Sequence, residues 1–165
     1  MKNRKRNQKG FSLIELLIVV SIILIIAAIA IPNLLQARVA ANEASAVASL
    51  RTINTAMLSY FNSYPDVGYA PTIAALGGST CDAPDQNGAC IIDNVLSSGT
   101  KSGFGFTVTQ VGSGPPYYQY LSAAAPVSNG GNRSFCSTQD GVVYYDPTGS
   151  AIPDQPTCLA LTPLQ

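Results

Sequence analysis

The feature that most constrains the fold of this chain is an unbroken apolar run near its amino terminus. Residues 11–31 contain one charged side chain, Glu15, and two serines among 21 positions. As a helix that rises about 1.5 Å per residue, the run would span roughly 30 Å, the thickness of a bilayer's hydrocarbon core. The sequence therefore predicts a membrane-spanning helix over residues 11–31.

Charge is distributed unevenly about this run. Five of the nine Lys and Arg residues precede it, all before residue 10, and the next one is Arg38. By the positive-inside rule, residues 1–10 stay in the cytoplasm and the bulk of the chain lies outside. Beyond residue 10, four basic side chains stand against nine acidic ones, a net charge of −5. That balance argues against a surface that binds nucleic acid.

Helical periodicity resumes beyond Pro32, where a helix break is expected because proline lacks an amide donor. From Asn33 to Tyr64 the apolar residues recur at steps of three, four and seven, which places them on one helical face. This face consists of Val39, Ala46, Leu50, Ile53, Met57 and Tyr60. Ten of the eleven prolines and thirteen of the fourteen glycines follow Tyr64, so the long helix is expected to cover residues 11–64.

Residues 65–165 have the pattern of a globular domain built from strands and turns. Phe104, Phe106 and Val108 alternate with glycine and threonine, as in a half-buried strand. Further strands are expected within residues 117–124 and 141–145, and a shorter one at 133–136. The predicted fold class is α+β, with a long amino-terminal helix packed against a small antiparallel sheet of three to four strands.

The four cysteines, Cys81, Cys90, Cys136 and Cys158, all lie in this second part. Downstream of an export signal, an even number indicates two disulfides formed outside the cytoplasm. Three connectivities are possible, and the sequential pairing Cys81–Cys90 and Cys136–Cys158 is preferred because it closes short local loops. Zinc binding is disfavoured, because the chain has no C-x-x-C pair and no histidine.

An ordinary cleaved signal peptide is the alternative interpretation of the amino terminus, with residues 28–30 as a possible cleavage site. The length of the apolar run and the carboxylate near its start count against it, since hydrocarbon penalises a buried charge. The residues KGFSLIE, from Lys9 to Glu15, resemble the processing site of type IV prepilins and pseudopilins. A basic leader ends in glycine, phenylalanine follows, and glutamate is the fifth residue of the product. The resemblance covers roughly residues 1–35.

This resemblance implies that residues 1–10 are a removable leader peptide. A prepilin peptidase would cleave the Gly10–Phe11 bond at the cytoplasmic face and methylate the new amine of Phe11. The product would stay in the inner membrane as a single-pass protein in contact with lipid. Assembly machinery there would then extract it into an extracellular filament with copies of itself and other pilins.

The same resemblance gives Glu15 a role in assembly. A carboxylate buried among bundled helices needs a partner, and the free amine of Phe11 in a neighbouring subunit is the implied cation. A pair within one chain, four residues apart on the same helix, is the alternative. Members of the family commonly have a helix proline where Pro32 stands, and many also have glycine eight residues before it. This chain has Leu24 there, so the segment should unwind less readily in a filament.

The resemblance extends more weakly to the second part of the chain. The pair Cys136–Cys158 resembles the family's disulfide-bounded loop near the carboxyl end, and Cys81–Cys90 would be an additional link. A calcium loop at residues 82–88 is disfavoured because the ligand spacing and the closing glutamate are missing. No catalytic residue, cofactor or metal site is predicted, since the chain lacks a histidine base and a phosphate-binding glycine loop.

The predicted function is therefore that of a structural subunit of a type IV pilus filament. Two alternatives remain open at this point: a pseudopilin of a type II secretion system, and a membrane-anchored extracytoplasmic binding module that does not polymerise. The two disulfides and the extended loop region favour the pilus subunit over the pseudopilin.

Overall fold

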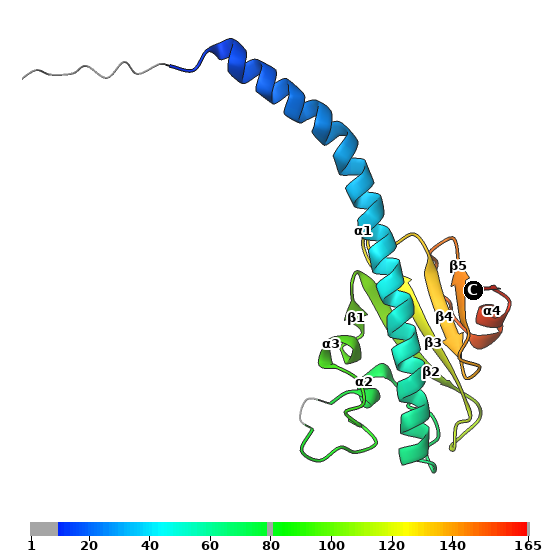
Figure 1. The fold of residues 1–165 in the computed structure, drawn as a ribbon. Coiled ribbons are helices and arrows are strands. Elements are labelled where there is room, and N and C mark those ends of the chain that lie inside the picture. The colour runs from blue at the N-terminus through cyan, green and yellow to red at the C-terminus, as the bar shows by residue number, and fades with distance from the viewer. Residues whose placement is uncertain (1–9, 79–80, 165) are drawn as a thin grey trace, which may run out of the picture. The chain divides into compact units, whose positions relative to one another are not determined.

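The structure, a computed structural model, describes residues 10–78 and 81–164. The chain forms two compact units, an amino-terminal unit up to Arg38 and a globular unit from Val39 onward. The helix α1 (Leu13–Ser63) contributes to both (Figure 1). The other elements, in chain order, are α2 (Ile73–Leu76), α3 (Asn94–Ser97), β1 (Thr100–Lys101), β2 (Phe104–Val111), β3 (Gln119–Pro126), β4 (Ser134–Thr138), β5 (Val143–Asp146), α4 (Gln155–Leu159) and β6 (Thr162–Pro163).

In the amino-terminal unit, α1 passes through Pro32 without interruption. The predicted helix break at Pro32 is therefore wrong for this structure. Proline removes only one amide donor from the helical ladder, and the hydrogen bonds of the flanking turns can hold the helix together across that gap. The large apolar side chains from Leu13 to Leu35 are exposed. Contacts with other described segments therefore do not bend or interrupt the helix here.

In the globular unit, the predicted helical face of α1 is confirmed as the buried one. Five of its six residues are buried, and Val39 at its start is partly buried. Arg51, Thr55 and Ser59 point away from this face and are exposed. The three-and-four spacing thus identified correctly which side of α1 packs against the rest of the unit.

The strands form one antiparallel sheet in the order β1-β2-β3-β4-β5-β6, so each strand pairs with its neighbour in the chain. The α+β class and the antiparallel meander agree with the prediction, but the described residues contain six strands rather than three or four. The additional strands, β1 and β6, are two residues long and pair only with β2 and β5. A strand of two residues is too short to show alternation of apolar and polar side chains, so the sequence pattern did not reveal β1 or β6. Pro163 is compatible with a strand because β6 is at the sheet edge.

The two faces of the sheet are covered by different segments of the globular unit. The first core lies between the sheet and α1 and includes Leu50, Ile53, Met57, Phe104, Tyr120 and Phe135 (Figure 1). The second core consists of Leu121, Ala123, Cys136, Ile152 and Cys158. Because β3 contributes to both cores, residues 120–124 are all buried and do not alternate with exposed positions.

Polar side chains link α1 to the sheet within the first core. Asn54 donates from Nδ2 to the hydroxyl of Ser137 at 2.8 Å, and its Oδ1 accepts from the hydroxyl of Tyr120 at 3.0 Å. Burial raises the pKa of Tyr120 well above its usual value, with Tyr69 and Asp140 adding to the effect. The Tyr120 hydroxyl therefore stays protonated and remains a donor, which fixes the helix against the central strands.

Candidate functional site

The predicted cleavage site lies before the first helix, outside any helix or strand. Gly10, Phe11 and Ser12 precede α1, and Phe11 is 82% exposed. A Cβ placed on Gly10 would meet no described atom within 4 Å, so a side chain would have space there. The predicted leader extends over residues 1–10, of which residues 1–9 lie outside the described part of the chain. Within the described residues, the peptide bond between Gly10 and Phe11 thus belongs to no helix or strand.

Glu15 forms a hydrogen bond at the start of α1 that the sequence interpretation did not include. Its Oε2 accepts from the backbone N–H of Ser12 at 2.9 Å, and the carbonyl of Ser12 accepts from the N–H of Leu16 at 3.2 Å. This is half of a capping box, in which the residue at the third helical position reaches back to the capping residue. The S-x-x-E spacing from Ser12 to Glu15 was the sequence signal for it. A carboxylate in the first turn also favours the helix dipole.

The segment that follows Glu15 exposes an unusual amount of apolar surface. The large side chains from Leu16 to Leu35 are 46–69% exposed, and the most apolar 18-residue window of α1 contains no buried residue. By length and composition, α1 is long and apolar enough to cross a membrane. Exposed apolar surface on this scale marks a region that contacts lipid or other protein.

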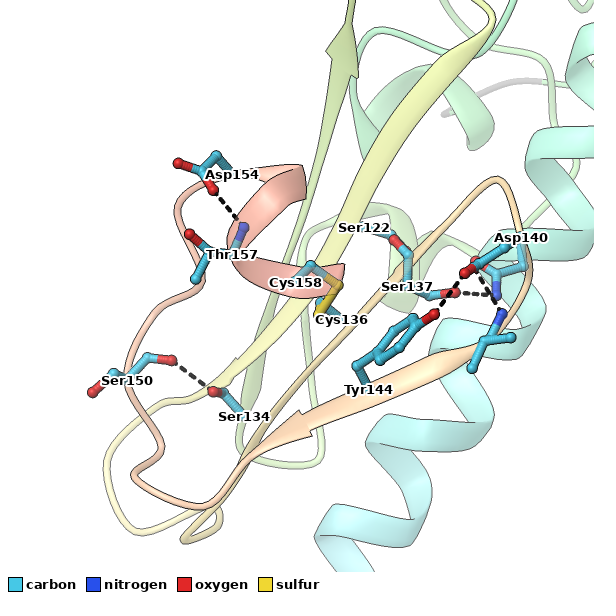
Figure 2. The surroundings of a disulfide bond; sticks show 12 residues. Ser122, Ser134, Cys136, Ser137, Asp140, Tyr144, Ser150, Asp154, Thr157 and Cys158 are labelled. Atoms are coloured by element: carbon cyan, nitrogen blue, oxygen red, sulfur yellow. Dashed lines mark hydrogen bonds between the residues drawn. A yellow bond between two sulfur atoms is a disulfide. The ribbon is translucent and has the colours of Figure 1, made fainter. Parts of the chain in front are cut away.

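Both disulfides belong to the globular unit and join the cysteines sequentially. Cys136 of β4 and Cys158 of α4 are fully buried in the second core, where their bond ties the short helix to the sheet (Figure 2). Cys81 and Cys90 join the ends of a loop between α2 and α3, nearer the surface. Among the described residues, no three His, Cys, Asp or Glu side chains are grouped so that they could hold a metal ion.

An ion pair between the buried Glu43 and the partly exposed Arg133 was also missed by the sequence interpretation. Glu43 of α1 accepts from Nε and Nη2 of Arg133 at 2.9 and 2.7 Å, and from the backbone N–H groups of Asn132 and Arg133 at 2.9 and 3.2 Å. Burial opposes ionisation of Glu43, but these donors together lower its pKa below the usual value. The carboxylate thus fastens the loop between β3 and β4 to α1.

The loop that Glu43 holds also passes very close to a second turn. Gly130 contacts the carbonyl oxygen of Gly103 so closely that a Cβ on Gly130 would overlap it. Gly103 itself has a positive φ of 75°, which glycine adopts without strain. The amide of Asn42 on α1 donates to the carbonyl of Gly130 at 3.0 Å and supports the same arrangement.

Replacing Glu43 with alanine is expected to destabilise the globular unit by about 2–3 kcal/mol, because four donors lose their acceptor. The cost should be below that of a fully buried pair, since the Arg133 side chain is 41% exposed and water can hydrate it. Heat-induced unfolding of the full-length chain in detergent, followed by tyrosine fluorescence, measures the change. Replacing Lys101 with alanine is the control, because its pair with Asp93 is long at 3.9 Å and half-exposed and should contribute less than about 0.5 kcal/mol.

Because of the same ion pair, we expect the stability of the globular unit to depend on pH. The pKa of Glu43 is lower in the folded chain than its unfolded value of about 4.5. Its ionised carboxylate therefore stabilises the folded state fully when the pH is above the unfolded pKa. This stabilisation is lost as the pH falls from the unfolded pKa through the folded pKa. The unaltered chain should therefore lose more stability than Glu43→Ala between pH 5 and the folded pKa. Equal acid sensitivity of the two chains would contradict this role of Glu43.

Comparison with known proteins gives matches to the amino-terminal segment that contains Gly10, Phe11 and Glu15. Residues 5–31 match the family model described as the prokaryotic N-terminal methylation motif. The chain is 62% identical over 45 residues to the type IV wide pilus major component PilA4 of Thermus thermophilus, which covers 27% of this chain and 34% of that protein. It is 43% identical over 70 residues to the type IV major pilin protein PilA of Myxococcus xanthus, covering 38% of this chain and 32% of that protein.

These matches span only about a third of the length of either relative, and no solved structure is a significant match. The methylation motif nevertheless coincides with the exposed Gly10–Phe11 bond, with Glu15 in the first turn of α1 and with the exposed apolar segment that follows. The amino-terminal segment of this chain therefore carries the methylation motif and is similar to the amino-terminal segments of these two type IV pilins.

Proposed function

We propose that this chain is a structural subunit of a type IV pilus filament, made as a precursor and assembled through its apolar amino-terminal helix. In this proposal, residues 1–10 are the leader, residues 11–64 supply the long helix with its membrane-spanning part at 11–31, and residues 65–165 supply the disulfide-linked globular domain. A prepilin peptidase cleaves between Gly10 and Phe11 and methylates the amine of Phe11.

The observation that carries this proposal is the methylation motif over residues 5–31 on a helix whose apolar side chains are exposed. Such a surface is unstable in water, so the helix needs lipid first and other helices afterwards. The open chain around Gly10 and Phe11 suits a peptidase, which must bind an extended backbone. Five basic residues before position 10 favour a cytoplasmic leader, with the globular unit on the outer side of the inner membrane.

Glu15 and Phe11 are proposed to set the register between subunits. In the single chain, the Glu15 carboxylate is exposed and bonded only to the N–H of Ser12 among the described residues. When apolar helices bundle away from water, that one hydrogen bond no longer balances a full negative charge. The methylated amine of a neighbour's Phe11 supplies the missing cation, and only one axial offset between subunits brings the two groups together.

The proposal assigns the globular unit a structural role and no catalysis. The relatives named above are pilus components, and the cysteines that might act as nucleophiles are joined in disulfides. The proposed partners are copies of this chain, other pilins and the assembly machinery of the inner membrane. The proposed location is the inner membrane before assembly and the extracellular filament afterwards.

The mass of the mature chain, taken from sheared surface material, tests the processing steps. The expected mass lacks residues 1–10, includes one additional methyl group and lacks four hydrogens because two disulfides have formed. An unprocessed mass, or a mass that corresponds to cleavage after residues 28–30, would contradict the proposal. Substituting Gly10 with a bulky residue such as leucine is the control, since it should leave the precursor uncleaved.

Negative-stain microscopy of the same sheared material tests the filament itself. Thin filaments that contain this chain on the cell surface would support a pilus subunit. The processed mass without surface filaments would favour the pseudopilin of a secretion system. A chain that keeps residues 1–10 and remains in the membrane would instead favour an anchored binding module.

A further inference from the structure

A groove of about 350 Å³ opens on the globular unit between α1, the start of β4 and Leu164, which follows β6. Its size is at the lower end of the range for ligand sites, large enough for a side chain or two but not for a helix. Small and apolar side chains form its walls, and its charged side chains are two arginines and Glu43, which is paired with Arg133. The residues that matter here are Ala44, Ala48, Phe135 and Leu164 for the walls, with Arg51 and Arg133 for the charge.

Arg133 is held in a fixed orientation at this groove. Glu43 binds Nε and Nη2, and the guanidinium carbon lies 5.6 Å from the ring centroids of both Phe135 and Tyr145. Within the described residues, the remaining nitrogen, Nη1, has no hydrogen-bond partner, while the side chain stays 41% exposed. A donor already oriented in this way loses little conformational entropy when it binds a carboxylate.

Arg51 lies on the exposed side of α1 at the same groove. Its side chain has no hydrogen bond or ion pair with any residue in the described ranges 10–78 and 81–164. The groove therefore gathers two of the four basic side chains that follow residue 10, in a chain that has nine acidic ones. Because Glu43 lines the same groove and is paired with Arg133, one net positive charge remains there, supplied by Arg51. A net positive groove on an acidic molecule is complementary to a carboxylate of a second copy of that molecule.

Asp66 has the properties that such a contact requires. It lies in the exposed turn that follows α1, next to the exposed Pro65, and forms no hydrogen bond or ion pair within the described part of the chain. The carboxyl end of a helix disfavours negative charge, so a cation from outside the chain would stabilise Asp66. Most other aspartates are bonded locally, as Asp140 is to Tyr144 and Asp154 to Thr157.

We propose that the groove at Arg51 and Arg133 binds the Asp66 carboxylate of a second copy of this chain, with Pro65 packed against the alanine wall. This inference rests on the proposed function, because it names a contact between subunits of the filament. The groove and the Asp66 turn are different surfaces, separated by roughly 18 Å along α1. A contact between unlike surfaces is heterologous, and its repetition builds an open helical assembly when it does not close into a ring.

Charge reversal tests the contact in cells that display filaments of the unaltered chain. Arg51→Glu is expected to lower the yield of sheared filaments at least about tenfold without changing the amount of processed chain in the membrane. Combining Arg51→Glu with Asp66→Arg should restore most of the yield. Arg38→Glu is the control with the same change in charge, because Arg38 is exposed on α1 outside the groove. Normal yield from Arg51→Glu, or an equal loss from Arg38→Glu, would overturn the inference.

Zero-length coupling of amines to carboxylates identifies the partner directly. Arg51→Lys keeps the charge and adds a reactive amine, and coupling within filaments should give a dimer in which Lys at position 51 is joined to Asp66 of another chain. Coupling of Lys101 to Asp93, 3.9 Å apart in one chain, shows that the reaction has worked. A link from position 51 only to Glu43, or to a different protein, would overturn the inference. Absence of filaments from the unaltered chain would overturn the proposed function itself.

Discussion

Replacing Glu15 with alanine or leucine is expected to leave cleavage at Gly10–Phe11 intact and to lower the yield of filaments by roughly a hundredfold or more. The magnitude follows from the cost of leaving one partner of a buried ion pair without the other, about 3–5 kcal/mol. In the proposed membrane-bound subunit, Glu15 lies near one end of the span, where removal of its charge costs little. Between bundled helices, the amine of a neighbour's Phe11 would have no counter-charge. Immunoblots of membranes and of sheared filaments measure the two outcomes separately.

Glu15→Gln separates the two roles that the structure and the family resemblance give to this residue. Glutamine still accepts a hydrogen bond from the N–H of Ser12, so the start of α1 should be preserved. It carries no charge, so the pair with Phe11 is lost and filaments should be as scarce as in the alanine variant. Ser21→Ala is the control, because the Ser21 hydroxyl bonds only to the carbonyl of Leu17 one turn earlier among the described residues. Normal filaments from Glu15→Gln would contradict the ionic role.

Removing the Cys136–Cys158 disulfide by a double alanine substitution is expected to destabilise the globular unit by on the order of 4 kcal/mol. Restriction of the unfolded chain over a separation of 22 residues accounts for about 3 kcal/mol of this. The remainder comes from the cavity left in the second core, where both sulfur atoms are fully buried. Thermal unfolding of the purified chain, with and without the substitutions, measures the difference.

The Cys81–Cys90 disulfide is the matched control within the same chain. Its separation is only 9 residues, and the loop that it closes lies nearer the surface, so its removal should cost about 2–3 kcal/mol without a cavity term. Filaments are expected to survive its loss better than the loss of Cys136–Cys158, which ties α4 to β4. Equal destabilisation by the two double substitutions would contradict the contribution of burial.

The helical face from Ala46 to Tyr60 and the strand at Phe104 to Val108 were predictable because their signals are periodic and local. A helix that packs on one side must repeat its apolar residues every three or four positions, and a half-buried strand every two. The capping box from Ser12 to Glu15 has an equally local signal, because its S-x-x-E spacing lies within four residues.

Other features depend on residues that are distant in the sequence. Glu43 and Arg133 are 90 residues apart, and nothing near either residue indicates that the other will neutralise it. The strand β3 shows no alternation because the carboxyl-terminal segment covers its second face, which local patterns do not reveal. The two-residue strands β1 and β6 form only because β2 and β5 offer unpaired backbone groups for hydrogen bonding.

The sequence by itself determined a helix long and apolar enough to cross a membrane, the methylation motif over residues 5–31, and the helical face that packs on the sheet, because each is a short-range pattern of apolar or charged residues. Only the tertiary structure decided that Glu43 holds the β3–β4 loop and that Arg51 and Arg133 share one groove. These depend on hydrogen bonds and contacts between segments whose proximity arises only when the chain has folded.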